Sequence, residues 1–319
     1  MAGSSSNRRK GLEFEQPILE LEDKIEELKN LAATTGMDLN GEINPLRERC
    51  SRLLEETYAS LDPWQGVAVA RHPDRPLVDD YIARMCDGFM ELAGDKAFAD
   101  DRAIVTGIAR IGDQRVMLVG HRKGTSTAEK IACHFGCAHP EGYRKALVKM
   151  KLAEKFGLPV IALIDTPGAY PGVGAEERGQ AYAIAKNIME MARLRTPIIC
   201  IVTGEGGSGG ALGIGVGDVV CVLKYAYYSV ISPEGCAAIM WKDGEMASKA
   251  AGALKLTAPD LKGFGIIDEI VDEPLGGAHR DKGAMAEILK KRILHHLQEL
   301  QSIPMDDLIR RRQDKFRQM

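Results

Sequence analysis

Two glycine-rich segments hold most of the sequence's potential for chemistry. They are Asp165–Gly179 (DTPGAYPGVGAEERG) and Thr203–Gly217 (TGEGGSGGALGIGVG), and each follows an apolar run and precedes a helical pattern. Glycine lets a ligand approach the main chain closely, and a helix start has unpaired N–H groups at the positive end of its dipole. Two such turns facing one cleft would hold a negatively charged oxygen.

Backbone N–H groups are therefore the first candidates for catalysis. We expect Gly209 and Gly210 to begin a helix and to act as oxyanion donors, with Gly172 and Val173 beginning the facing helix. Loss of one such donor typically costs about 3 kcal/mol of transition-state stabilisation. The pattern thus predicts stabilisation of an enolate or a similar developing anion by main-chain groups.

Nucleophilic catalysis by a side chain is the competing hypothesis. Ser208 stands in a Gly206-x-Ser208-x-Gly210 spacing, which matches the GxSxG nucleophile elbow. A serine nucleophile needs a base, and His279 is the only downstream candidate in a glycine loop. No further acidic motif completes a triad, so we consider this hypothesis the weaker one.

Nucleotide binding is disfavoured by the spacing of the same glycines. The turn Asp165–Gly168 (DTPG) copies the DxxG turn of GTPases, but no GxxxxGK[ST] phosphate loop lies upstream of it. The glycines of Gly204–Gly210 match a dinucleotide fingerprint only loosely, and no acidic residue ends a strand at the required distance.

Cations and possible metal ligands lie outside these glycines. We assign Lys123, which follows an expected strand, and Arg178 as substrate-binding residues. The stretch Cys133–His139 (CHFGCAH) contains the right ligand types for zinc. Structural zinc normally needs two separated ligand pairs, and no second Cys/His pair lies nearby, so we expect no metal on this chain.

The elements that must position these residues alternate as in an α/β fold. Apolar runs predict strands at residues 103–111, 115–120, 159–164, 197–202, 219–223, 227–231 and 266–271. Amphipathic patterns predict helices at residues 78–92, 142–156, 233–241 and 285–300. A Gly112-Asp113 pair suits a tight hairpin between the first two strands. We therefore expect one α/β domain over residues 63–302.

The remaining segments are shorter. Residues 1–13 are expected to be a disordered tail and residues 303–319 a polar, solvated one. Between 14 and 62, two apolar stripes at helical spacing predict a helical hairpin. This hairpin is interpreted either as a subunit-contact arm or as a lid on its own domain.

Composition excludes several functional classes. The 319 residues are 45% hydrophobic and 27% charged with a net charge of −3, which gives no bulk attraction to nucleic acid or membrane. No apolar run approaches the roughly 20 residues of a membrane span. No apolar stretch follows Arg8-Arg9-Lys10, so we expect these residues not to be a secretory signal. Seven cysteines scattered through apolar runs are typical of a reducing compartment. We expect a cytoplasmic protein.

Four longer motifs resemble a known family, the carboxyltransferase alpha subunits of bacterial acetyl-CoA carboxylase. They are Asp165–Gln180, Gly204–Asp218, Ser229–Cys236 and Glu273–Arg280. The resemblance extends from about Phe14 to about Leu300 and departs at Gly120–His139, where the Cys/His-rich stretch lies.

This resemblance implies a crotonase-like fold, a spiral of ββα units whose sheets stack at an angle. It implies transfer of a carboxyl group from carboxybiotin, tethered to a carrier protein, to acetyl-CoA, giving malonyl-CoA for fatty acid synthesis. Gly209 and Gly210 would match the glycine pair whose N–H groups hold the biotin ureido oxygen, with Gly172 and Val173 in the facing loop.

The resemblance also implies partners. A beta subunit with a zinc ribbon would bind acetyl-CoA in an α2β2 core, working with a biotin carboxyl carrier protein and a biotin carboxylase. No cofactor would be bound covalently to this chain, and the zinc would belong to the beta subunit only.

Two alternatives stay open. A stand-alone crotonase-like hydratase or decarboxylase would need an acid/base carboxylate pair, for which Glu176, Glu177 and Glu234 are candidates. A non-catalytic scaffold subunit would use only the helical arm. For the carboxyltransferase, we expect activity only with the beta subunit, a mild effect of Ser208→Ala, and loss of activity with intact assembly for Gly210→Val.

Overall fold

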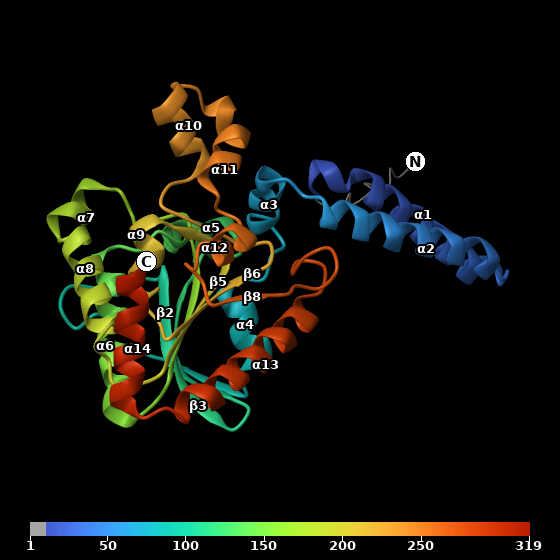
Figure 1. Ribbon diagram of the computed structural model, residues 1–319. Coiled ribbons are helices and arrows are strands. Elements are labelled where there is room, and N and C mark those ends of the chain that lie inside the picture. The colour runs from blue at the N-terminus through green and yellow to red at the C-terminus, as the bar shows by residue number, and fades with distance from the viewer. Residues whose placement is uncertain (1–10) are drawn as a thin grey trace.

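A computed structural model describes residues 11–319 and contains one mixed β-sheet of eight strands (Figure 1). Its order is β1-β2-β3-β4-β5-β6-β8, with β7 pairing with β5 off this path. The strands β1 to β3 are antiparallel and the remaining pairs are parallel. Their bounds are β1 (Gly88–Glu91), β2 (Ile104–Ile111), β3 (Gln114–His121), β4 (Val160–Thr166), β5 (Ile198–Gly207), β6 (Val219–Leu223), β7 (Tyr227–Ser229) and β8 (Glu269–Val271).

The apolar runs before the two glycine segments form the centre of this sheet. Every residue of β4 and β5 is buried, as expected for parallel strands covered on both faces. Figure 1 shows α6 (Pro140–Phe156), α8 (Gln180–Met191) and α14 (Met305–Gln318) on one side, and α4 (Val78–Met85) and α13 (Lys282–Gln301) on the other. The predicted α/β architecture is confirmed.

The shorter helices lie mostly near the carboxyl ends of the strands. They are α3 (Pro63–Ala70), α5 (Thr127–Ala132), η2 (His134–Gly136), α7 (Val173–Glu177), α9 (Ser208–Leu212), α10 (Pro233–Trp241), η3 (Gly244–Met246), α11 (Ala247–Leu254) and α12 (Ala258–Gly263). No described helix is both long and apolar enough to cross a membrane.

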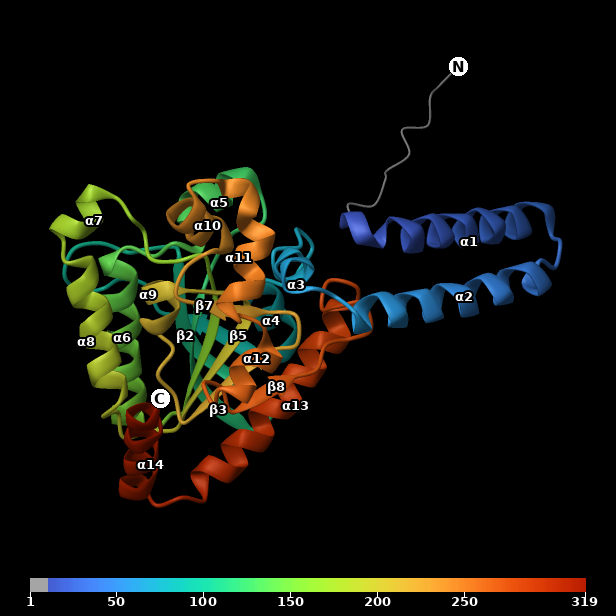
Figure 2. The same ribbon diagram turned by 45° about the horizontal axis from the view of Figure 1, so that its top comes forward.

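The predicted N-terminal hairpin is present as α1 (Gln16–Thr35) and α2 (Asn40–Ala59), preceded by η1 (Glu13–Glu15). The two helices run antiparallel and extend away from the domain instead of covering it (Figures 1 and 2). Their apolar stripes pack against each other. The arm reaches the domain at its base, where Val69 and Tyr225 join its apolar cluster and Arg280 pairs with Glu15 and Glu22. There, buried Glu15 accepts a hydrogen bond of 2.7 Å from the Tyr58 hydroxyl.

The structure differs from the sequence-based expectations in two segments, and a third lies mostly outside the described residues. The helix predicted at residues 78–92 ends at Met85, because Gly88–Glu91 pairs with β2 as an edge strand. Residues 303–319 are not a solvated tail: they contain α14, whose Leu308 and Arg312 are buried. Most of the predicted tail 1–13 lies outside the described residues, and its last residue, Glu13, begins η1.

Candidate active site

The two glycine segments touch each other where their strands end. β4 and β5 are neighbouring parallel strands, and the carboxyl ends of such strands lie at the same edge of a sheet. A Cβ added at Gly207 would lie 2.1 Å from the Pro167 carbonyl oxygen, and one at Gly210 would lie 2.5 Å from the Gly168 carbonyl carbon. Glycine is required at both positions because the two main chains are in contact.

Helix α9 begins directly at this contact. Gly207 is its N-cap, and Ser208, Gly209 and Gly210 form its first turn, whose N–H groups have no partner within the helix. Ser208 has φ of 47°, in the left-handed region, so the chain turns sharply from β5 into the helix. The predicted helix start at Gly209 and Gly210 is thus present, with α9 ending at Leu212.

The two glycines differ in their surroundings. Gly210 is buried against the Gly168–Ala169 main chain. Gly209 is only partly buried, and an added Cβ would meet nothing closer than Ile184 at 3.6 Å. A side chain at position 210 would therefore displace the first glycine turn, so from this geometry we expect Gly210→Val to disturb the fold as well as to remove activity.

Gly209 borders a mostly apolar cavity of about 300 Å³. Helix α14, which the sequence had suggested to be a solvated tail, closes part of it. Among the described residues that line it, no side chain is a carboxylate, histidine, lysine or cysteine. The lining residues are Ser208, Gly209, Leu212, Gly215, Val220, Tyr228, Ser229, Val230, Leu261, Ile266, Phe316 and Met319.

Gly172 and Val173 begin a helix, as predicted, with Gly172 as the N-cap of α7. Gly172 packs against the Tyr170 ring, since an added Cβ would lie 2.4 Å from it. Val173 is 75% exposed. Within the described part of the chain, no hydrogen bond joins these two residues to Gly209 or Gly210. They belong to the same glycine segment as Gly168 and Ala169, which contact Gly210, but they follow that contact in the chain.

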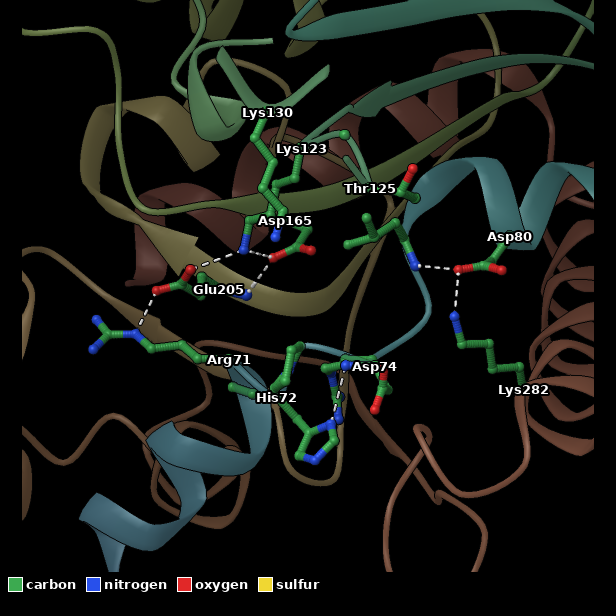
Figure 3. A pocket seen from close by; sticks show the side chains of 15 residues that line it. Arg71, His72, Asp74, Asp80, Lys123, Thr125, Lys130, Asp165, Glu205 and Lys282 are labelled. Atoms are coloured by element: carbon green, nitrogen blue, oxygen red, sulfur yellow. Dashed lines mark hydrogen bonds and ion pairs between the residues drawn. The ribbon is translucent and has the colours of Figure 1, made fainter. Parts of the chain in front are cut away.

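A second, polar cavity of about 310 Å³ lies at the carboxyl ends of the same strands (Figure 3). Lys123 occupies its centre, where its ammonium lies 2.6 Å from Asp165 Oδ1 and 2.8 Å from Glu205 Oε1. Arg71 donates to Glu205 at 2.7 Å and lies 2.5 Å from Glu234. Cations and carboxylates therefore neutralise one another on the wall of this cavity.

The charged groups of this cluster interact strongly with one another. Burial alone would raise the pKa of Glu205, but the charges of Lys123 and Arg71 outweigh it and lower this pKa to about 2. Asp165 also accepts a hydrogen bond of 2.9 Å from the Glu205 N–H. The cluster fixes the ends of β4 and β5 relative to each other, and thereby the position of α9.

The predicted substrate-binding cations both have protein partners. Lys123 is mostly buried and bonded to two carboxylates. Arg178 lies 2.7 Å from Glu141 and 4.9 Å from the centre of the Phe98 ring. The sequence did not point to Arg71, Asp165 and Glu205 as site residues, although the last two lie near the carboxyl ends of β4 and β5, a position typical of site residues.

The competing nucleophile hypothesis is not supported by the geometry. His279 stacks on His72 with ring centres 3.9 Å apart and lies 3.5 Å from Glu15, at the base of the arm. Within the described chain, no hydrogen bond connects it to Ser208. Glu176 and Glu177 are exposed, and Glu234 is paired with Arg71, so these carboxylates form no acid/base pair at the Gly209 cavity.

Solved structures share this fold. The transcarboxylase 12S hexamer structure superposes with a TM-score of 0.54 at 22% identity, covering 69% of this chain and 44% of that one. A Pseudomonas malonate decarboxylase hetero-tetramer in complex with coenzyme A gives a TM-score of 0.59 at 15% identity, covering 73% and 90%. These likenesses show the fold, which the chain shares with a transcarboxylase and a malonate decarboxylase.

Sequence relatives define the family more narrowly. The chain matches the family described as acetyl co-enzyme A carboxylase carboxyltransferase-like over residues 11–319. It is 55% identical over 309 residues to the acetyl-coenzyme A carboxylase carboxyl transferase subunit alpha of Rhodopirellula baltica, covering 97% of each chain. The subunit of the same name from Haemophilus ducreyi is 57% identical over 306 residues, covering 96% of each. The chain belongs to this family of alpha subunits.

Proposed function

We propose that this chain provides the biotin side of a split carboxyltransferase site, which moves a carboxyl group from carboxybiotin on a carrier protein to acetyl-CoA. The observation that carries the proposal is the pair of helix-start N–H groups at Gly209 and Gly210, beside a cavity lined by no acid or base side chain. Such a site stabilises an oxygen anion through main-chain donors.

The chemistry of biotin fits these donors. The ureido oxygen gains negative charge as the carboxyl group leaves the adjacent nitrogen, and N–H groups held in place beforehand stabilise that charge. The nitrogen that is left can accept the acetyl proton, so the reaction needs no side-chain base. The apolar walls of the Gly209 cavity suit the carbon skeleton of biotin and exclude water from the charged oxygen.

The remaining half of the site lies, on this proposal, in the beta subunit. We assign acetyl-CoA binding and the zinc ion to that partner, in an α2β2 assembly served by a biotin carboxyl carrier protein and a biotin carboxylase. All seven cysteines are free thiols, which supports a cytoplasmic location. Gly172 and Val173 remain candidates for the loop facing biotin.

The reverse reaction tests this proposal directly. Malonyl-CoA-dependent carboxylation of free biotin is measured with this chain alone, with the beta subunit alone and with the two mixed. We expect turnover only in the mixture. Turnover by this chain alone would indicate a self-contained crotonase-like enzyme, and no turnover in a mixture that forms a stable complex would favour a scaffold subunit.

A further inference from the structure

Three potential metal ligands meet outside the proposed active site, at the start of α6. Asp101 lies before β2, His134 begins η2, and His139 is the N-cap of α6. One ligand atom from each residue lies within 4.8 Å of the other two. The sequence had offered the two histidines without a partner nearby, and the fold adds a carboxylate from a distant part of the chain.

The carboxylate of Asp101 is buried without a permanent cation. The residue is 4% exposed, and its oxygens accept N–H bonds from Ala103 at 2.9 Å and from His139 at 2.7 Å. The Lys145 ammonium binds the Asp101 main-chain carbonyl and the Asp100 carboxylate instead. Among the described residues, no lysine or arginine side chain pairs with this carboxylate. A buried carboxylate in this state is costly unless a cation neutralises it.

The imidazoles are placed to supply nitrogen ligands. His134 Nδ1 lies 3.8 Å from Asp101 Oδ1 and has no hydrogen-bond partner. The His139 ring stacks on the Tyr170 ring with centres 4.0 Å apart. The His134 ring contacts the His139 ring edge-on, with centres 4.3 Å apart. Neutral imidazole is the form of histidine that binds metals. Both histidines are partly exposed, so an ion can enter from solvent.

Two other clusters of this kind are less suitable. In Glu15/His72/His279, Arg280 lies 3.3 Å from Glu15, and Tyr58 donates to the same carboxylate. In Cys221/Glu269/His296, Arg292 lies 2.6 Å from Glu269. An arginine already supplies the positive charge in both cases, whereas Asp101 has none.

We propose that Asp101, His134 and His139 bind a divalent transition-metal ion, with Zn²⁺ the best fit to two nitrogens and one oxygen. Ligand atoms on one tetrahedral zinc ion lie about 3.3 Å apart, and these three lie within 4.8 Å of one another, so the side chains would move closer on binding, and water would take the open position. The ion would tie together the ends of three segments that precede β2, form η2 and begin α6.

The same ion would reach the first glycine segment through Tyr170. Tyr170 stacks on His139, and its N–H donates to the Ala138 carbonyl at 3.0 Å. Gln180 binds both the Ala138 and the Tyr170 carbonyls. Metal binding would therefore hold the Asp165–Gly179 segment against the start of α6.

Calorimetric titration of the full-length, chelator-treated chain with Zn²⁺ in reducing buffer tests the proposal. We expect one saturable site. Changes to outer-shell residues already lower metal affinity by about 10- to 100-fold, so His134→Asn and His139→Asn should lower the Zn²⁺ affinity by at least that factor. The His139 side chain makes no capping hydrogen bond, and asparagine is a favoured N-cap residue, so the variant at 139 should preserve the fold of α6. Two variants serve as matched controls and should bind Zn²⁺ as the unmodified chain does. They are His295→Asn, at an exposed position of α13, and Cys137→Ser.

Co²⁺ supplies a readout of the ligand types. Its visible absorption should report a nitrogen and oxygen site without a thiolate charge-transfer band, and Zn²⁺ should raise the melting temperature of the unmodified chain but not of the histidine variants. Three results would each overturn the proposal. They are no saturable binding by the unmodified chain, histidine variants that bind Zn²⁺ as tightly as the unmodified chain, and loss of binding in Cys137→Ser.

Discussion

Gly209 and Gly210 are neighbours in one helical turn, but they are glycine for different physical reasons. Gly210 admits the main chain of the first glycine segment, which lies 2.5 Å from a hypothetical Cβ. Gly209 has room for a Cβ and borders the apolar cavity. Position 210 therefore serves the contact between two turns, and position 209 leaves space for a ligand. The sequence shows both glycines alike and cannot separate these roles.

Gly209→Ala should consequently separate catalysis from folding. The new methyl group fits the fold but occupies the approach to the N–H donors, and a displacement of about 1 Å can cost about 100-fold in rate. We expect biotin carboxylation by the complex to fall by at least about tenfold, with an unchanged melting temperature. Gly252→Ala, in α11 with open space around it, is the matched control. Unchanged turnover in Gly209→Ala would contradict the oxyanion assignment.

Glu205 gives a prediction about pH. Its pKa is about 2 in the folded chain against an ordinary value of 4.5. Because the folded value is the lower one, its contribution to stability is complete above about pH 4.5 and is lost as the pH falls towards 2. At about 1.4 kcal/mol per pKa unit, this contribution is on the order of 3 kcal/mol at neutral pH.

Urea unfolding at several pH values tests it. Glu205→Gln should lower the free energy of unfolding at neutral pH and flatten its decrease between about pH 4.5 and 2, relative to the unmodified chain. Glu245→Gln, at an exposed position in η3, should change neither quantity. An equal pH slope in Glu205→Gln and the unmodified chain would show that Lys123 and Arg71 do not depress this pKa.

At the scale of elements, the sequence predicted the strands and helix starts that depend on local residue patterns. Apolar runs followed by glycine placed β4, β5 and the start of α9, because buried parallel strands and helix starts have strong signals of their own. Edge strand β1 was missed because it is defined by pairing with β2, and the ion cluster because Arg71, Lys123 and Glu205 meet only in three dimensions.

Helix α14 shows the same limit most clearly. Arg312 is one of three consecutive arginines, and nothing local distinguishes it. In the fold its guanidinium is fully buried, where it binds Asp218 at 2.7 Å and the carbonyls of Met191, Leu194 and Thr196. Together with Lys315, whose ammonium lies 2.7 Å from Asp268, this side chain attaches α14, and with it Phe316 and Met319 on the wall of the Gly209 cavity.

Arg312→Ala should therefore act on stability and on the site together. Removing one partner of a buried ion pair costs about 3–5 kcal/mol, and loosening α14 should raise KM for free biotin in the complex. The exposed neighbour provides the control, since Arg311→Ala should leave both urea unfolding and KM unchanged. If the two variants unfold alike, α14 is attached by its apolar residues and not by Arg312.

At the scale of the whole molecule, two features of the chain bear on whether it works with a partner: the Gly209 cavity and the extended arm. The Gly209 cavity supplies donors and apolar walls but no side-chain acid or base among its described lining residues. The arm extends away from the domain (Figure 2), and large apolar side chains such as Leu31 and Met37 are exposed near its far end. Both features are those of a subunit whose function needs a partner, which favours the subunit-contact interpretation of the arm over the lid.

Leu31→Glu tests the arm without disturbing the site. Leu31 is 49% exposed on α1 and lies far from the base of the arm. The isolated chain should therefore keep its melting temperature, whereas a buried glutamate at a subunit contact costs enough to weaken assembly. We expect the mixture with the beta subunit to lose activity on dilution earlier than the unmodified complex, and to recover it at high protein concentration. Phe156→Glu, at an apolar position at the end of α6 that is 64% exposed, should give the same dilution curve as the unmodified complex. Identical dilution curves for Leu31→Glu and the unmodified complex would show that the far end of the arm makes no contact on which activity depends.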